Sequence, residues 1–282
     1  MSSQRLNLPR EFPGGILYDA EEEQAVLRVV RAQSPFRYYG PDCQFEVRAF
    51  EREFARFLAS RPHETWPETT PFLATATNSG TGALEVALDA LGVGCGDEVA
   101  TAGFMWISTI SSIVRCRAIP LLIDADETMN LDPIDLRRRI TDRTKVVLLV
   151  HMAGEPARMG RVMTVVREIN RDRERRGLPL LRGLDDCAQA IGGLGHGAPG
   201  SVVPVAPDGA HRLGAFGDAA IFSLQINKNI TSGEGASSSC GIPSSTGACR
   251  RLTTWGSFAT REARATSKTS RNRRWSGVKG GV

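Results

Sequence analysis

Two patterns of apolar and polar residues alternate along most of the chain. Short apolar runs of strand length, such as Val146–Val150, are separated by stretches such as 157–176, in which apolar residues recur at helical spacing. The first pattern is typical of buried strands and the second of amphipathic helices. Because strands that alternate with helices form parallel sheets, we expect an α/β fold with a mainly parallel sheet between layers of helices. The predicted strands are 72–76, 99–102, 119–123, 145–150, 179–184 and 219–224, and the predicted helices between them are 83–91, 106–116, 132–140 and 157–176.

Two further helices are predicted before the first strand. Residues 19–33 begin with a cluster of acids, which favour the first turn of a helix, and carry Val26, Leu27 and Val30 on one apolar face. Core packing is the simplest interpretation of the large apolar residues that recur at helical spacing in 44–59. These residues are Phe45, Phe50, Phe54, Phe57 and Leu58.

The composition is that of a globular protein. The chain has 282 residues, of which 41% are hydrophobic and 23% charged, so it holds enough apolar material for a core and global disorder is excluded. The longest aliphatic run, Val146–Val150, is far shorter than the about 20 residues that span a bilayer. The N-terminus lacks the apolar segment of a secretion signal. We therefore expect a cytoplasmic protein that does not bind membranes.

The six cysteines do not form a metal-binding pattern. None belongs to a Cys-x-x-Cys pair, and no histidine lies at ligand spacing from one, which argues against zinc. In a chain without a secretion signal they are expected to be free thiols rather than disulfides. We therefore expect no metal site.

The charge is distributed unevenly. The net charge of +4 divides into +8 for residues 237–282, which hold nine Lys or Arg and one Glu, and −4 for the rest of the chain. A basic tail is one way to bind nucleic acid. Because this tail lacks regularly interleaved aromatic residues, we expect no nucleic-acid partner.

Candidate binding and catalytic residues follow three of the predicted strands, at the carboxyl ends where parallel α/β folds bind ligands. Ser79-Gly80-Thr81 opens a helix, where free amides suit a phosphate; an ordinary helix cap is the alternative. Asp185 and Asp186 follow the fifth strand, and one of them either meets a positive group or caps a turn. Lys228 follows the last strand among polar residues and glycines, where it is either a Schiff-base nucleophile or a surface side chain.

Together, these three features match the needs of pyridoxal phosphate. Its phosphate requires a helix N-terminus, its pyridine nitrogen a carboxylate and its aldehyde a lysine amine. Five spaced motifs indicate the same cofactor, because together they resemble those of a known family. The motifs are Arg37-Tyr38-Tyr39-Gly40 with Phe50-Glu51-Arg52-Glu53-Phe54-Ala55, then Asn78-Ser79-Gly80-Thr81-Gly82-Ala83-Leu84, Gly92-Val93-Gly94-Cys95-Gly96-Asp97-Glu98-Val99, Asp185-Asp186-Cys187-Ala188-Gln189-Ala190, and Gly217-Asp218 with Phe222-Ser223 and Lys228–Gly235. In this order they resemble the DegT/DnrJ/EryC1/StrS sugar-aminotransferase family, which has the aspartate-aminotransferase fold (fold type I). The resemblance covers about residues 14–236.

The resemblance implies a fold and a set of site residues. The fold is the large domain of pyridoxal-phosphate-dependent transferases, a mainly parallel sheet of seven strands between helices. Lys228 then carries the cofactor and moves the substrate proton, and Asp186 pairs with the pyridine nitrogen. The other implied cofactor-binding residues are Gly80, Thr81 and Ser223 at the phosphate, Gln189 at the phenolic oxygen, Trp106 stacked on the ring, and Asn272 at the phosphate of the neighbouring subunit.

The implied activity is the transfer of an amino group from glutamate or glutamine to a keto-sugar nucleotide or a keto-cyclitol. The family resemblance also implies a homodimer that takes part in sugar biosynthesis and secondary metabolism. A sugar dehydratase with the same cofactor is the enzymatic alternative. Lys228 disfavours it, because that branch has a histidine in place of the lysine. A degenerate, non-catalytic copy of the family is the non-enzymatic alternative.

The resemblance breaks off shortly after Lys228. Residues 1–236 are predicted to form an N-terminal arm and the cofactor-binding large domain. Residues 237–282 stand where the family has a small C-terminal domain, and up to residue 270 they contain few aliphatic side chains. Such a segment buries too little apolar surface to become ordered. We expect a disordered basic tail here, the result of truncation or of a change of reading frame.

Overall fold

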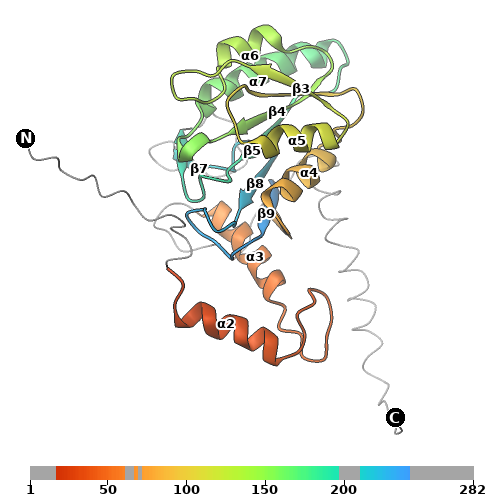
Figure 1. The fold of residues 1–282 in the computed structure, drawn as a ribbon. Coiled ribbons are helices and arrows are strands. Elements are labelled where there is room, and N and C mark those ends of the chain that lie inside the picture. Colours follow the sequence, from red (N-terminus) through yellow and green to blue (C-terminus); the bar gives the residue numbers. More distant parts are fainter. Residues whose placement is uncertain (1–16, 61–66, 69–71, 197–209, 242–282) are drawn as a thin grey trace, which may run out of the picture.

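The computed structural model describes residues 17–60, 67–68, 72–196 and 210–241 (Figure 1). The helices are α2 (Ala20–Arg31), α3 (Glu46–Ala59), α4 (Gly80–Ala90), α5 (Ile107–Arg115), α6 (Pro133–Arg139) and α7 (Met159–Arg175), with a short 3₁₀ helix at Met152–Gly154. The strands are β1 (Phe72–Thr77), β2 (Glu98–Ala102), β3 (Ile119–Ile123), β4 (Thr144–Val150), β5 (Arg182–Asp186), β6 (Leu194–His196), β7 (Ala210–Arg212), β8 (Ala219–Ser223) and β9 (Ala236–Gly241).

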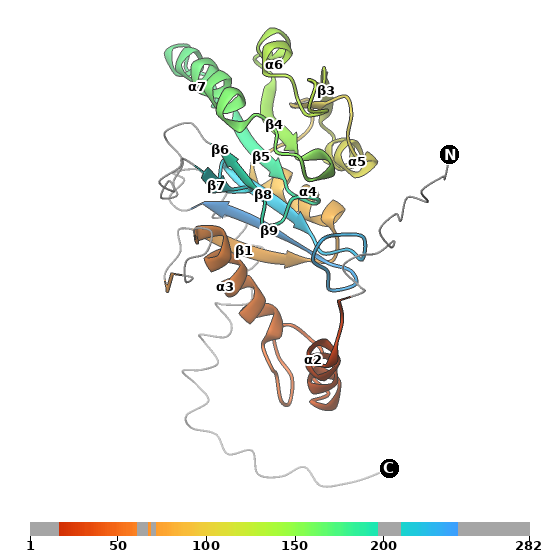
Figure 2. The same cartoon turned by 90° about the vertical axis from the view of Figure 1, so that its left-hand side faces the viewer.

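Seven of these strands form one twisted sheet in the order β1-β9-β8-β5-β4-β2-β3 (Figure 2). Within it, β9 runs antiparallel to both of its neighbours, β1 and β8. The other neighbouring strands pair in parallel, so the carboxyl ends of all strands except β9 lie along one edge. The expected α/β fold with a mainly parallel sheet is therefore confirmed.

Helices cover both faces of this sheet, and the residues of β4 show how the sequence specifies burial on both sides. All of Val146–Val150 is buried. Val147 and Leu149 pack in one cluster with side chains of α3, α6 and α7, whereas Val146 and Leu148 pack in another with α4 and α5. A continuous apolar run is what a strand needs when both of its faces are covered, which is why β4 was predictable.

Strand β9 is missing from the predicted elements, and it corrects the domain boundary expected at residue 236. Ser237, Ser238 and Ser239 are fully buried, because β9 lies between β1 and β8 and pairs with both along its length. The Ser238 hydroxyl also donates to the Ala83 carbonyl of α4 (3.0 Å). Backbone pairing on two sides therefore orders a strand that has few aliphatic residues. The expected tail is wrong for 237–241; its remainder, 242–282, lies outside the described residues.

Two other elements differ from the predictions for local reasons. Strand β5 is shifted to Arg182–Asp186, in register with β4 from Val146 to Val150, so both aspartates belong to the strand rather than to the turn after it. Strands β6 and β7 have three residues each and pair antiparallel as a separate small sheet. Strands this short carry no periodic pattern from which to predict them.

The N-terminal helix α2 lies near its predicted boundaries, but none of its residues is buried. Its start is fixed by Asp19, whose side chain accepts from the Glu21 amide (2.8 Å). Val26 and Val30 are 63% and 62% exposed, so the expected apolar face is not covered by the described part of the chain. Figures 1 and 2 both show α2 apart from the sheet, beyond the end of α3.

Every helix within the described residues is too short or too polar to span a bilayer. The cysteines within the described ranges, Cys43, Cys95, Cys116, Cys187 and Cys240, are free thiols.

Candidate functional site

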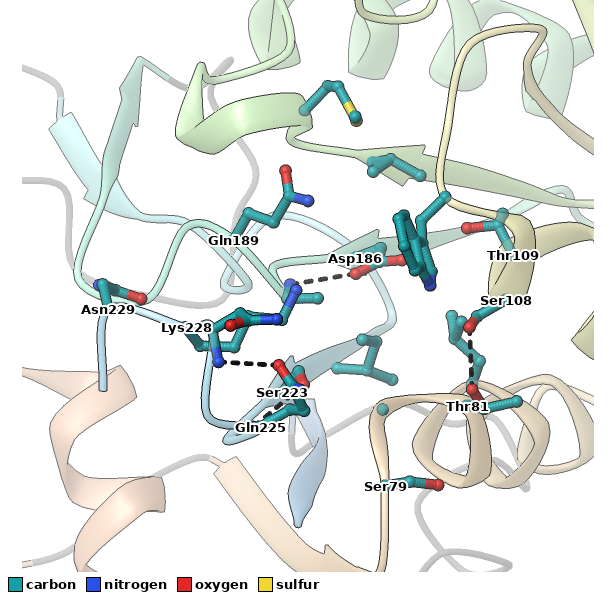
Figure 3. Close-up of a pocket in the computed structure, with 18 of the residues that line it drawn as sticks. Ser79, Thr81, Ser108, Thr109, Asp186, Gln189, Ser223, Gln225, Lys228 and Asn229 are labelled. Carbon is teal, nitrogen blue, oxygen red and sulfur yellow. Dashed lines mark hydrogen bonds between the residues drawn. The ribbon is translucent and has the colours of Figure 1, made fainter. Parts of the chain in front are cut away.

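A cavity of about 770 Å³ opens at the carboxyl ends of the parallel strands (Figure 3). Its walls come from the start of α4, the start of α5, the ends of β4, β5 and β8, and the loop after β8. Segments far apart in the sequence therefore meet here. The cavity brings together these residues from the sequence prediction: Gly80, Thr81, Trp106, Asp186, Gln189, Ser223 and Lys228. Asn272 lies outside the described residues.

The first turn of α4 is placed to bind an anion. Ser79 caps the helix and accepts from the amide of Gly82 (3.1 Å), which leaves the amides of Gly80 and Thr81 without an intrahelical acceptor. A methyl group at position 80 would lie 3.2 Å from the Ser223 Cβ, so a glycine lets β8 and α4 approach closely. Free amides, the helix dipole and the neighbouring Ser223 hydroxyl together favour a phosphate.

Asp186 is a buried carboxylate in the wall of this cavity, which Glu234 also lines. Burial raises the pKa of Asp186 to about 6, and the opposing contributions come from the Ala188 amide, the Lys228 charge and the Thr109 hydroxyl. The Ala188 amide donates to Asp186 Oδ1 at 3.0 Å. A buried carboxyl with a raised pKa is stabilised by any cationic group that comes into contact with it.

Lys228 is the cation of the cavity. It lies half-buried in the loop after β8, where its backbone amide donates to the Gln225 carbonyl (2.9 Å). Burial lowers the pKa of Lys228, and the Asp186 carboxylate acts in the opposite direction. A lowered pKa increases the fraction of neutral amine, the form that attacks a carbonyl.

Gln189 presents its side-chain amide in a fixed orientation. The Ala153 amide donates to Gln189 Oε1 (2.6 Å), which leaves Nε2 as the donor for a ligand. Asn130 holds the turn that contains Ala153, because its side chain accepts from the Met152 amide (3.0 Å) and donates to the Glu155 carbonyl (3.1 Å). Gln189 is thus positioned by a turn and a buried asparagine from other parts of the chain.

Trp106 lies at the N-cap of α5 and is 65% exposed although it lines the cavity. A large aromatic side chain that stays open to solvent at a binding cavity is available to stack on a ligand ring.

The structure distinguishes the two adjacent aspartates, between which the residue pattern alone does not choose and of which the family resemblance favours Asp186. Neighbouring residues of a strand point to opposite faces, so Asp186 lines the cavity and Asp185 lies on the other side of the sheet. Asp185 is fully buried near Gly217, whose amide lies 3.4 Å from Asp185 Oδ2. Burial raises the pKa of Asp185 to about 7, although backbone amides of 214–217 act against it.

Sequence reasoning missed Ser108, Thr109, Asn130 and Ala153. Ser108 accepts from the Thr81 hydroxyl (2.9 Å), and Thr109 lies next to Asp186 (Figure 3). The family resemblance pointed to Trp106 but not to Ser108 or Thr109, although both lie within three residues of it at the start of α5. Asn130 and Ala153 have no such signal, because their role depends on a contact between distant segments.

No group of three His, Cys, Asp or Glu side chains that suits a metal ion is found among the residues with described positions.

The fold and the position of the cavity place the chain among α/β proteins that bind ligands at the carboxyl ends of parallel strands. Comparison with known families is more specific. The model of the DegT/DnrJ/EryC1/StrS aminotransferase family matches residues 18–275, and the chain belongs to this family. The expected family membership is thereby confirmed.

Curated relatives include aminotransferases that act on cyclitols. The L-glutamine:2-deoxy-scyllo-inosose aminotransferase of Streptoalloteichus tenebrarius is 37% identical over 190 residues, which are 67% of this chain and 38% of the relative. The spore coat polysaccharide biosynthesis protein SpsC of Bacillus subtilis is 33% identical over 229 residues, which are 81% of this chain and 48% of the relative. The chain therefore spans less than half the length of these relatives.

Solved structures agree with the fold. An aminotransferase from Psychrobacter cryohalolentis superimposes with a TM-score of 0.63 at 30% identity, over 83% of this chain and 50% of that one. DesV of S. venezuelae superimposes with a TM-score of 0.60 at 31% identity, over 83% and 52% of the two chains.

Proposed function

We propose that this chain is the large domain of an aminotransferase that uses pyridoxal phosphate and transfers an amino group from glutamine or glutamate to a keto-cyclitol or a keto-sugar. The observation that carries the proposal is the meeting of Lys228, Asp186 and the N-terminus of α4 in one cavity. These are the amine, the carboxylate and the anion site that the cofactor requires. Assembly as a homodimer and a cytoplasmic location belong to the same proposal and are supported by membership of the family.

The described residues fit the cofactor. The amides of Gly80 and Thr81 and the Ser223 hydroxyl would hold its phosphate, since Gly80 leaves no side chain between them. Asp186 would pair with the ring nitrogen, and the Lys228 amine would form a C=N bond to the aldehyde carbon as water leaves. Two further contacts belong to this proposal: Gln189 Nε2 at the phenolic oxygen and Trp106 on the face of the ring. The assignment of Asn272 to the phosphate of the other subunit also remains a proposal.

When bound, pyridoxal phosphate supplies an electron sink for bonds at the carbon that carries the amino group. The chain's own residues supply the rest. Asp186 in its ionised form would hold a proton on the ring nitrogen, because its carboxylate is buried in the wall of the cavity. The Lys228 amine would take a proton from the carbon that carries the donor's amino group and deliver it to the carbonyl carbon of the cofactor. Its lowered pKa favours the neutral amine that takes the first proton.

We propose a keto-cyclitol as the amino acceptor, in preference to a keto-sugar nucleotide. Relatives named as aminotransferases of 2-deoxy-scyllo-inosose and scyllo-inosose support this choice, whereas GDP-perosamine synthase of Vibrio cholerae (33% identical) supports a keto-sugar nucleotide. In the described lining of the cavity, Lys228 is the sole cationic side chain. An uncharged cyclitol needs no further cation, but a nucleotide diphosphate is usually bound by arginine or lysine.

A dehydratase and a non-catalytic copy are the competing proposals. The lysine at position 228 disfavours a dehydratase of this family, which has a histidine at that place. A non-catalytic copy has no need of a buried Asp186 and a half-buried Lys228 in the same cavity, since a buried charge is costly unless it is used or paired.

The test is amino transfer by the full chain loaded with pyridoxal phosphate. L-glutamine is supplied with scyllo-inosose or, separately, with a GDP-linked 4-keto sugar, and the aminated product is measured by mass spectrometry. We expect amination of scyllo-inosose that is abolished in Lys228→Ala and unchanged in Lys145→Arg, because Lys145 pairs with Asp97 (2.9 Å) away from the cavity. A chain that binds the cofactor and aminates neither acceptor would support the non-catalytic copy.

A further inference from the structure

The outer edge of β1 is hydrogen-bonded by two side chains in place of a further strand. Among the described strands, β1 is the last of the sheet on its side, with β9 as its neighbour. At Ala76, the amide donates to Glu51 Oε1 (2.8 Å) and the carbonyl accepts from Arg37 Nη1 (3.2 Å). The amide and the carbonyl of one strand residue point to the same side, so both groups of Ala76 face away from β9. Arg37 and Glu51 thus act at this residue as a neighbouring strand would.

Arg37 and Glu51 also bind each other, which makes this a closed arrangement of three groups. The Arg37 guanidinium donates to Glu51 Oε1, the same oxygen that accepts from Ala76. Their side chains are 22% and 15% exposed, so this ion pair is far better shielded from water than most surface pairs. The guanidinium also lies over the ring of Tyr38, 5.2 Å from its centroid.

The residue held in this way lies just before the proposed phosphate site. Ala76 is followed by Thr77, the last residue of β1, and then by the turn into α4, whose N-cap is Ser79. On its inner side the same strand end is paired with β9, where Ala76 lies opposite Ser237. The end of β1 is therefore fixed on both edges immediately before the amides of α4.

The two residues of the pair lie outside the lining of the cavity. Arg37 lies between α2 and α3, and Glu51 lies in α3, which packs against β1. A direct contact with a ligand in the cavity is thus not their role, and they act through the backbone of Ala76.

We propose that the Arg37–Glu51 pair positions the N-terminus of α4 and thereby sets the affinity of the cavity for a phosphate group. The inference rests on the proposed function, because it takes the phosphate to be that of pyridoxal phosphate. Arg37 and Glu51 are positioning residues. Loss of either one releases the outer edge of Ala76, so that the strand end and the amides that follow it are less well placed for the phosphate.

The experiment compares two ligands that differ only in the phosphate. Full-length wild type, Arg37→Gln, Glu51→Ala and the double variant are titrated with pyridoxal 5′-phosphate and with pyridoxal, and binding is followed by quenching of tryptophan fluorescence. We expect each single variant to bind pyridoxal phosphate about tenfold more weakly and the double variant no more weakly than the singles, because either change breaks the whole pair. Binding of pyridoxal should be unchanged.

The matched control is Arg28→Gln. It breaks the ion pair between Arg28 and Glu46, which also links the α2 and α3 region but is about half exposed on each side and does not touch β1. This control should bind both ligands like wild type. Arg37→Lys, which keeps the charge but replaces the two guanidinium nitrogens with one ammonium nitrogen, should give an intermediate loss and keeps the test decisive if Arg37→Gln unfolds.

Hydrogen exchange gives a readout that needs no cofactor. The Ala76 amide should exchange faster in Glu51→Ala and in Arg37→Gln than in wild type, with the other β1 amides changed less. Equal losses of affinity for both ligands, or unchanged exchange at Ala76, would show that the pair serves the general fold and would overturn the proposal. If wild type binds no pyridoxal phosphate, the proposed function fails. The exchange at Ala76 and the binding of inorganic phosphate then decide whether the pair positions α4.

Discussion

Lys228 and Asp186 shift each other's pKa across the cavity. The lysine charge lowers the pKa of Asp186, and the aspartate charge raises that of Lys228, while burial acts in the opposite direction on each group. The two groups are therefore coupled before any ligand binds. Burial destabilises the ionised form of Asp186. A cofactor with a cationic ring nitrogen beside Asp186 would stabilise that form, because it would add a second positive charge to that of Lys228.

The first prediction follows from this coupling. Asp186→Asn should fold normally, because it removes a buried charge, but it should slow amino transfer about 100-fold or more, since the amide no longer holds a proton on the ring nitrogen. Steady-state rates with saturating cofactor, beside a urea unfolding curve, measure both effects. Asp185→Asn is the matched control, and near-normal rates in Asp186→Asn would refute the role assigned to Asp186.

A second prediction concerns Gly80. Gly80→Ala places a methyl group 3.2 Å from the Ser223 Cβ, inside the space proposed for the phosphate. The affinity for pyridoxal phosphate should fall about tenfold, whereas helix propensity predicts no loss of stability from the added methyl. Titration with pyridoxal, which lacks the phosphate, is the control. Equal weakening of both ligands would indicate a general distortion of the cavity instead.

Asp185 gives a prediction about stability and pH. Its pKa is raised from 3.8 to about 7 in the folded chain, so the folded state binds this proton more tightly than the unfolded state. The free energy of unfolding therefore falls as the pH rises from about 4 to about 7 and is then flat. Asp185→Asn should remove a decline of about 2–4 kcal/mol over this range. Urea unfolding at pH 4.5 and pH 7.5 measures it; an equal pH dependence in wild type and variant would contradict the assignment.

His151 gives a prediction of the opposite sign. It is fully buried, and its Nδ1 accepts from the Ala157 amide (3.1 Å), so the neutral ring is the folded form. Burial lowers its pKa from 6.5 to about 4. The unfolded chain thus takes up a proton first as the pH falls, and stability is lost between about pH 6.5 and pH 4. His151→Gln should flatten this part of the profile. A variant that keeps the same loss on acidification would show that another group causes it.

How far the sequence predicts this molecule differs from element to element. β4 was predictable because both of its faces are covered and Val146–Val150 is a continuous apolar run. β9 was not, because Ser237–Ser239 is buried through pairing with two strands, and pairing of distant segments has no local pattern. The composition rule that predicted disorder from residue 237 counts side chains and ignores such pairing.

The residues of the site likewise divide into those that the sequence predicts and those that it does not. Lys228 and Asp186 were predictable as residue types that stand beside strand ends in a fixed order, and the resemblance to a family gave them roles. The partners that orient the site were not predictable. Asn130 acts through the turn at Ala153, and Arg37 acts through the backbone of Ala76, in each case across a large distance in sequence. Only the folded chain shows that these segments meet.

The measurement that tests the central claim most directly is the site of cofactor attachment. The chain has four lysines, Lys145, Lys228, Lys268 and Lys279, so the experiment has few possible outcomes. Full-length protein is loaded with pyridoxal phosphate, reduced with borohydride and digested, and the peptides are mapped by mass spectrometry. We predict one pyridoxyl group per chain, on Lys228, and none on Lys145, whose amine is held by Asp97 and the Gly92 carbonyl (2.5 Å). Label on another lysine, or no label in a folded chain, would contradict the account.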